Sequence, residues 1–196
     1  MKILKRFGIT IVAIGILIVS FYAYLGGFQS IAVDEVDFSS TEIAIYLHKG
    51  SYQKIGESWD KFDKEWKEKI GEKCLMLSLY FDPPGTPEDE LRSVLACDLK
   101  LVPKDKLAKV YENFKTFKVP ANKALHATFP FKNKMSFMIG PMKVYPQMDK
   151  VLNQSGIVPP LAIEIYGNYE TMTQIQFLMP KDIKREAFSD LLALFK

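Results

Sequence analysis

Glu164 is the residue whose type and position most clearly suggest chemistry. It lies within the apolar segment 161–166, whose alternation would place Ala162, Glu164 and Tyr166 on one face of a strand. A carboxylate among apolar residues must be solvated or paired. Half-buried in a groove, it would attract a cationic ligand or act as a base with a raised pKa. The alternative is a strand whose second face is open to water.

Aromatic side chains could complete such a site, because ring faces suit flat or cationic ligands. Six are candidates for a groove wall: Tyr46, Trp59, Trp66, Tyr80, Tyr145 and Tyr166. Aromatics at helical spacing usually belong to a core, so the predicted ligand-binding residues are Glu164, Tyr46, Tyr80 and Tyr166. Met138, Met142 and Met148 could form a compliant wall, although core packing is the more usual role of such residues.

The remaining patterns point to no catalytic set, metal or cofactor. There is no Ser/His/Asp order, no glycine-rich phosphate loop and no Cys-x-x-Cys motif. His48 and His126, the two histidines, lack metal-ligand spacing and are expected at the surface. Gly26-Gly27 is interpreted as a junction. We therefore assign no catalytic residue and expect no cofactor.

The two cysteines, Cys74 and Cys97, lie on consecutive predicted strands. If Tyr80 lies opposite Leu91 or Arg92, the cysteines face each other within disulfide range. A register error of one residue would send them to opposite faces. The alternatives are therefore a disulfide outside the cytoplasm, or two buried thiols in a cytoplasmic domain.

The elements that must position these residues follow one order twice. The first half reads strand, helix, strand, strand at 42–47, 52–70, 74–81 and 91–99. The second half repeats that order at 124–129, 138–152, 161–166 and 174–179, with Pro146 interrupting the helix. A last amphipathic stretch, 183–195, is expected to cap one edge. The pattern predicts an α+β fold of duplicated β-α-β-β units.

A leader precedes this domain. Residues 7–25 are nineteen residues without a charge, enough to span roughly 28 Å as a helix, close to a bilayer core. A cleaved signal peptide is the alternative, but it would have a shorter apolar run followed by small residues, and bulky ones stand here. We predict an uncleaved signal anchor at 1–27, a tether at 28–40 and a ligand-binding domain at 41–196.

The basic excess of the chain belongs to this leader. Of 26 Lys+Arg residues, Lys2, Lys5 and Arg6 lie there without any acid, and the remaining 23 equal the 23 Asp+Glu. By the positive-inside rule, the N-terminus is cytoplasmic and the domain lies on the outer, periplasmic or extracytoplasmic side of a single-pass membrane protein. The neutral remainder lacks the clustered positive charge of a nucleic-acid-binding domain.

Three segments carry a family resemblance. HKGSYQKIGESWDKFDKEW, LYFDPPGTPEDELRSVLACDL and LAIEIYGNYETMTQIQFLMPK resemble, in order, a strand-to-helix junction and two hairpins of the GyrI-like small-molecule-binding superfamily, the effector-binding domains. The resemblance covers about residues 41–181. A leader joined to such a domain is most similar to the membrane-anchored, testis-expressed branch.

The resemblance implies an antiparallel sheet with two helices on one face and a ligand groove. It also implies an acid at the position of Glu164. Members fused to DNA-binding helices sense drugs, and some stand-alone members are similar to hydrolases. A related fold class binds haem, for which His48 could be an axial ligand. The sequence departs from the transcription-factor members in having no helix-turn-helix segment, which puts transcriptional control in doubt but not ligand binding.

Three functions follow as hypotheses. The first is a membrane-anchored protein that captures an amphipathic or cationic small molecule. The second is a hydrolase in which Glu164 activates water. The third is a scaffold with a vestigial groove, whose exposed loop 82–90 meets a protein partner that the sequence does not identify. No second catalytic group stands beside Glu164, which favours binding over catalysis.

Overall fold

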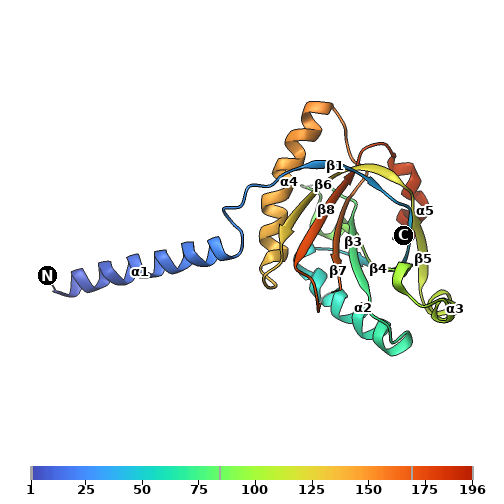
Figure 1. The fold of residues 1–196 in the computed structure, drawn as a ribbon, viewed down its shortest axis with the longest axis horizontal. Coiled ribbons are helices and arrows are strands. Elements are labelled where there is room, and N and C mark those ends of the chain that lie inside the picture. Colours follow the sequence, from blue (N-terminus) through green and yellow to red (C-terminus); the bar gives the residue numbers. More distant parts are fainter. Residues whose placement is uncertain (1, 84, 169, 196) are drawn as a thin grey trace.

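An antiparallel sheet of eight strands organises the domain in the computed structural model, which describes residues 2–83, 85–168 and 170–195 (Figure 1). The strand order is β1-β6-β8-β7-β3-β4-β2-β5. The strands are β1 (Asp34–Phe38), β2 (Thr41–Lys49), β3 (Leu75–Tyr80), β4 (Arg92–Asp98), β5 (Lys115–Val119), β6 (Asn122–Pro130), β7 (Ala162–Gly167) and β8 (Gln174–Pro180). The helices are α1 (Lys2–Tyr24), α2 (Ile55–Lys69), α3 (Lys104–Asn113), α4 (Ser136–Ser155) and α5 (Ser189–Ala193).

Two helices, α2 and α4, cover one face of the sheet. The stripe of α2 buries Phe62 and Trp66 against β2 and β4, as its apolar spacing predicted. A 3-10 turn, Tyr52–Lys54, precedes α2 and is capped by Ser51. The helix α4 packs on β6 and β8, and Gly140 permits the approach, because a Cβ there would lie 3.1 Å from Cζ of Phe177. The central strands β7 and β3 lie between the sheet areas that these helices cover.

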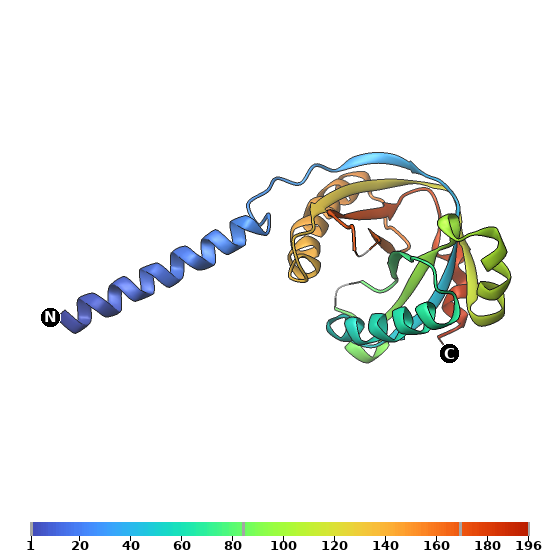
Figure 2. The same ribbon diagram turned by 60° about the horizontal axis from the view of Figure 1, so that its bottom comes forward.

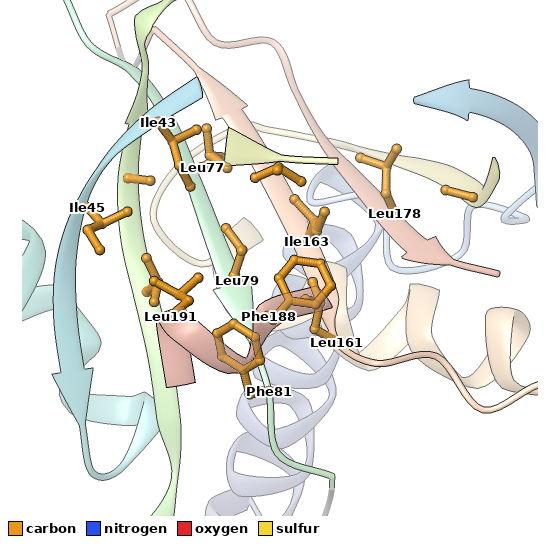
Figure 3. Packing of buried hydrophobic residues seen from close by; sticks show 14 residues of the cluster. Ile43, Ile45, Leu77, Leu79, Phe81, Leu161, Ile163, Leu178, Phe188 and Leu191 are labelled. Carbon is orange, nitrogen blue, oxygen red and sulfur yellow. The ribbon is translucent and has the colours of Figure 1, made fainter. Parts of the chain in front are cut away.

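The C-terminal segment covers the other face, around which the sheet curls (Figures 1 and 2). In Figure 3, Phe188 and Leu191 lie against apolar side chains of β2, β3 and β7. Residues 183–195 therefore pack on a face of the sheet, which corrects the prediction that they cap an edge. Alternation explains the arrangement, since Ile163 points to this face and its neighbour Glu164 to the helices.

The long helix α1 projects from the domain (Figure 2). Its window Phe7–Tyr24 has a mean hydropathy of 2.2 and none of it is buried, so it is a candidate membrane span by length and composition. Leu25, which the sequence placed in the span, instead packs into the domain core at 1% exposure. The side chains of Lys2, Lys5 and Arg6 lie outside the described residues, and the orientation of α1 stays a prediction.

Two parts of the chain differ from the sequence-based assignment. Residues 34–38, within the predicted tether, form edge strand β1 and pair with β6. The helix α3 and strand β5 were not predicted, and they follow β4 at the opposite end of the sheet. The order strand, helix, strand, strand occurs at β2-α2-β3-β4 and at β6-α4-β7-β8. That these halves are duplicates in origin stays a prediction.

A disulfide joins Cys74 and Cys97, whose Cα atoms are 5.2 Å apart. The register assumed from sequence was wrong, because Tyr80 lies opposite Ser93 and Cys97 lies opposite Met76. Relative to a register that places the two cysteines directly opposite, the ladder is shifted by two residues. A two-residue shift keeps both side chains on one face, so the bond still forms.

Candidate functional site

Glu164 lies at the centre of the sheet, on the face covered by α2 and α4. Strand β7 holds it opposite Ser78 of β3 and Phe177 of β8. Next to it the ladder contains a bulge: Leu77 pairs with Ile165 and Met76 with Gly167, which leaves Tyr166 as the extra residue. Bulges of this kind re-aim side chains and are common beside functional sites.

Two tyrosine hydroxyls hold the Glu164 carboxylate. Tyr145 of α4 donates to Oε1 at 2.5 Å, and Tyr166 donates to Oε2 at 2.8 Å. The hydroxyl of Tyr80 lies 3.1 Å from that of Tyr166 and extends the network into β3. We call Glu164, Tyr80, Tyr145 and Tyr166 the carboxylate cluster.

Aromatic rings surround the carboxylate cluster. Trp59 of α2 contacts the Tyr166 ring edge-on, with 6.1 Å between centroids, and Phe137 of α4 contacts the same ring at 5.3 Å. On the side of β3, the Tyr52 ring meets Tyr80 at 5.0 Å. Rings from both helices therefore enclose the acid.

Burial sets the electrostatics of the carboxylate cluster. Glu164 is 4% exposed, and desolvation raises its pKa to about 7, against the opposing effect of the hydrogen bonds from Tyr145 and Tyr166. Burial and the neighbouring carboxylate raise the pKa of Tyr145 and Tyr166 well above the usual range. The hydroxyls thus remain protonated donors while Glu164 exchanges its proton near neutral pH.

Within the described part of the chain, no ion pair joins Glu164 to a Lys, Arg or His side chain. The carboxylate has tyrosine donors but no counter-charge. Nearby, the buried Ser78 Oγ has no hydrogen bond of acceptable geometry among the described residues. An uncompensated buried acid is costly, and a cation placed beside it would offset that cost.

The structure brings together three of the four predicted site residues. Glu164, Tyr80 and Tyr166 are hydrogen-bonded neighbours. Tyr46 lies outside the carboxylate cluster, because β2 is separated from β3 by β4, and its ring stacks on Phe62 at 5.6 Å. Tyr145 was among the aromatic candidates but not among the chosen residues. Its pattern was that of an ordinary apolar helix position, and only the packing of α4 reveals its role.

Several other predictions change with the structure. Met148 is fully buried, while Met138 and Met142 are exposed and form no wall of the carboxylate cluster. His48 is buried rather than at the surface: its Nδ1 lies 2.8 Å from Ser58 Oγ and its Nε2 lies 3.1 Å from the Ser51 carbonyl oxygen. Both ring nitrogens are thus engaged, which argues against an axial ligand.

An ionic cluster fixes the start of loop 82–90 outside this site. Asp82, whose side chain is 5% exposed, accepts hydrogen bonds from the guanidinium groups of Arg92 and Arg185. Burial raises the pKa of Asp82, but these hydrogen bonds outweigh it and hold the pKa below its usual value. Arg185 also donates to the Phe81 carbonyl oxygen at 2.6 Å, which ties the loop to the C-terminal segment.

Two surface hollows lie away from Glu164. One, of about 460 Å³, is lined by residues of α3, β5 and α5, including Tyr111 and Phe117. The other, of about 390 Å³, borders Asp82 and Arg92 beside the C-terminal residues Leu192 and Phe195. Neither includes a residue of the carboxylate cluster. Glu164 itself is 4% exposed, so a ligand can reach it only after side chains that cover it move.

Comparisons with solved structures show the fold. EcmrR in its DNA complex matches with a TM-score of 0.57 at 9% identity, over 93% of this chain and 70% of EcmrR. SAV2435 bound to tetraphenylphosphonium matches with a TM-score of 0.54 at 11% identity, over 77% and 94%. A putative transcription regulation protein from Staphylococcus aureus MU50 matches with a TM-score of 0.53 at 11% identity, over 76% and 97%.

No protein-family model matches this chain, and no curated protein matches it in sequence. The solved structures confirm the GyrI-like fold that the resemblance implies. Placement in the membrane-anchored, testis-expressed branch stays a prediction.

Proposed function

We propose that this protein is a membrane-anchored binding protein for lipophilic cations, which bind beside Glu164 in the aromatic enclosure, the space among the rings of Tyr52, Trp59 and Phe137 and the carboxylate cluster. The observation that carries the proposal is the buried Glu164 carboxylate, held by two tyrosine hydroxyls and paired with no basic side chain among the described residues. SAV2435, which shares the fold, is bound to a phosphonium ion of this chemical class.

Charge and shape act together in this proposal. A hydrated cation would lose its water on entering the enclosure, whereas a weakly hydrated organic cation loses little. The rings of Trp59, Phe137 and Tyr80 would supply apolar contact and cation–π attraction to a bound cation. The carboxylate then supplies the electrostatic preference for a cation over a neutral molecule of the same size.

A ligand can enter only if the aromatic side chains around Glu164 move apart. Tyr145 and Phe137 both belong to α4, and Trp59 belongs to α2. Rotation of these side chains, each half-buried, would expose Glu164 without breaking the sheet. A ligand that stabilises the opened arrangement shifts the population toward it.

We further propose that α1 anchors the protein in a membrane, because its run of apolar residues is long enough to span a bilayer. None of its 18-residue window is covered by protein, which suits a helix surrounded by lipid. The disulfide between Cys74 and Cys97 supports a domain in an oxidising compartment, outside the cytoplasm. The full-length chain should then remain with membranes after carbonate extraction and keep its first residues.

The test compares a cation with a neutral molecule of similar shape. Full-length protein in nanodiscs is titrated with tetraphenylphosphonium and with triphenylphosphine oxide by calorimetry. The Glu164→Gln variant should lose about 10- to 100-fold in affinity for the phosphonium, because a charge-assisted contact is worth about 1.5–3 kcal/mol. Affinity for the neutral oxide should change little.

A matched control removes a carboxylate elsewhere. Glu170 is exposed in the connection from β7 to β8 and pairs with Lys73 at the surface. Glu170→Gln should leave affinity for both molecules unchanged. Equal losses for cation and neutral molecule in Glu164→Gln would show that Glu164 does not read charge, and the proposal would fail.

Hydrolysis is the second candidate, because a carboxylate whose pKa is about 7 suits a general base at neutral pH. The hydroxyls of Tyr145 and Tyr166 would then be the available proton donors. Ester hydrolysis that is present in the full chain and abolished in Glu164→Gln would favour this function. No hydrolysis above the variant's level would leave binding as the function of the site.

A further inference from the structure

The helix α4 has apolar side chains on two opposite faces. Gly140, Val144 and Met148 are buried against the sheet. The outer face carries Met138 and Met142, which are 53% and 70% exposed. With Met135 before the helix and Pro146 one turn later, they form a stripe at helical spacing, which we call the outer stripe. Contiguous exposed apolar side chains often mark a contact with another protein or a membrane.

The end of α1 is fixed beside this helix. Leu25 packs into the same apolar cluster as α4. Gly26, at φ +84°, and Gly27 close the C-terminus of α1 by donating to the carbonyl oxygens of Ala23 and Tyr22. A Cβ on Gly26 would lie 2.8 Å from Cγ of Pro130. The junction is therefore packed against the domain, in the apolar cluster to which α4 also contributes.

The figures show how α1 and α4 are arranged. In both views α4 lies on the side of the domain nearest to α1, and in Figure 1 it runs across the direction of α1 (Figures 1 and 2). A bilayer crossed by α1 would end near Tyr24 and Phe28, which are 60% and 67% exposed, as interfacial aromatics are. A helix lying across the anchor at this level runs along the membrane surface.

The charged side chains around the outer stripe also suit a helix that lies at the membrane surface. Lys132 and Lys134 are exposed just before α4, and Lys143 flanks the outer stripe. Basic side chains beside an apolar stripe are typical of helices at the lipid headgroup level. The exposed acid of the helix, Asp149, follows Pro146, so the apolar surface ends there.

We propose that the outer stripe of α4 is seated in the interface of the bilayer that α1 crosses. The inference rests on the proposed membrane anchoring, and it goes beyond it by assigning a second lipid contact to the domain. The same helix carries Phe137, which contacts Tyr166, and Tyr145, which lies beside the outer stripe and donates to Glu164. The wall of the enclosure is thus in contact with lipid, and lipophilic ligands enter from the membrane interface rather than from water.

The experiment uses full-length protein in nanodiscs of phosphatidylcholine and phosphatidylglycerol. Single cysteines carrying the environment-sensitive dye NBD replace Met138 or Met142 in the outer stripe, Ile14 in the anchor, and Leu101 as a control. Leu101 is 66% exposed and apolar, but it lies beside α3, across the molecule from α4. Lipids with a nitroxide near the headgroup or deep in the acyl chain then serve as quenchers.

The proposal expects dye at Met138 and Met142 to emit further to the blue than dye at Leu101. It also expects the shallow quencher to reduce their emission more strongly than the deep one, and dye at Ile14 to be quenched by the deep one. Quenching at Ile14 with the outer stripe no more affected than Leu101 would overturn the lipid seating and leave the anchor intact. Blue-shifted but unquenched dye in the stripe would mean that protein covers it, such as a second copy. An unquenched Ile14 would refute anchoring and the inference together.

Discussion

The strongest expectation from the carboxylate cluster concerns pH. Burial raises the pKa of Glu164 to about 7, whereas an unperturbed carboxyl titrates near 4.5. A cation can pair with Glu164 only when the carboxyl is ionised, so below pH 7 each binding event must release a proton. At pH 5 about 1% of the sites are ionised, so affinity for tetraphenylphosphonium should approach that of Glu164→Gln, about 10- to 100-fold weaker than the wild type at pH 8.

A tyrosine variant turns this expectation into a test of the geometry. Tyr145 donates to Oε1 at 2.5 Å and thereby stabilises the charged form of Glu164. Tyr145→Phe removes that donor and should move the inflection of the affinity profile upward by about one to two pH units, since a hydrogen bond to a charge is worth about 1.5–3 kcal/mol. Tyr111→Phe is the control, because its hydroxyl meets the exposed Glu42.

The measurement is the affinity of the full-length protein in nanodiscs for tetraphenylphosphonium and for triphenylphosphine oxide between pH 5 and pH 9. The neutral oxide should show no inflection in this range. A cation profile that is flat down to pH 5 would mean that Glu164 titrates in the ordinary range and is not desolvated. A downward shift in Tyr145→Phe would contradict the assigned direction of the hydrogen bond.

Three further predictions concern stability. The folded pKa of Glu164 lies above its unfolded value, so this group favours folding fully below about pH 4.5, and its contribution is lost as pH rises through about 7. Urea unfolding of the wild type should show a loss of about 3 kcal/mol across that window that Glu164→Gln does not show. Reduction of the bond between Cys74 and Cys97 should lower the free energy of unfolding by about 3 kcal/mol, as for a loop of similar length, and mass spectrometry with blocked thiols should find no alkylation before reduction. Asp82→Asn removes the negative charge shared by two guanidinium groups and leaves one acceptor oxygen where there were two, which should cost about 2–4 kcal/mol. Asp63→Asn at an exposed pair should cause no measurable change in the same assay.

The pairing of β3 with β4 shows which features of a strand a local sequence pattern can predict and which it cannot. The assumption that Tyr80 faces Leu91 or Arg92 was wrong, because the partner of Tyr80 is Ser93. The cysteines nevertheless meet, because a shift by two residues preserves the face of each side chain. Face is a property of the strand itself, but register also depends on how loop 82–90 packs. Asp82 fixes that loop through Arg185, 103 residues later, which no local pattern could indicate.

The sequence by itself determined which side chains share a face. Alternation in 161–166 placed Glu164 and Tyr166 together, and spacing in α2 placed Phe62 and Trp66 in the core, because side-chain direction within an element follows the period of its backbone. The tertiary structure decided which elements are neighbours. Pairing of β3 with β7 brought Tyr80 to Tyr166, and packing of α4 brought Tyr145 to Glu164 and turned Met142 outward. Those contacts depend on the whole set of buried surfaces at once, so they have no signature in the period of any one segment.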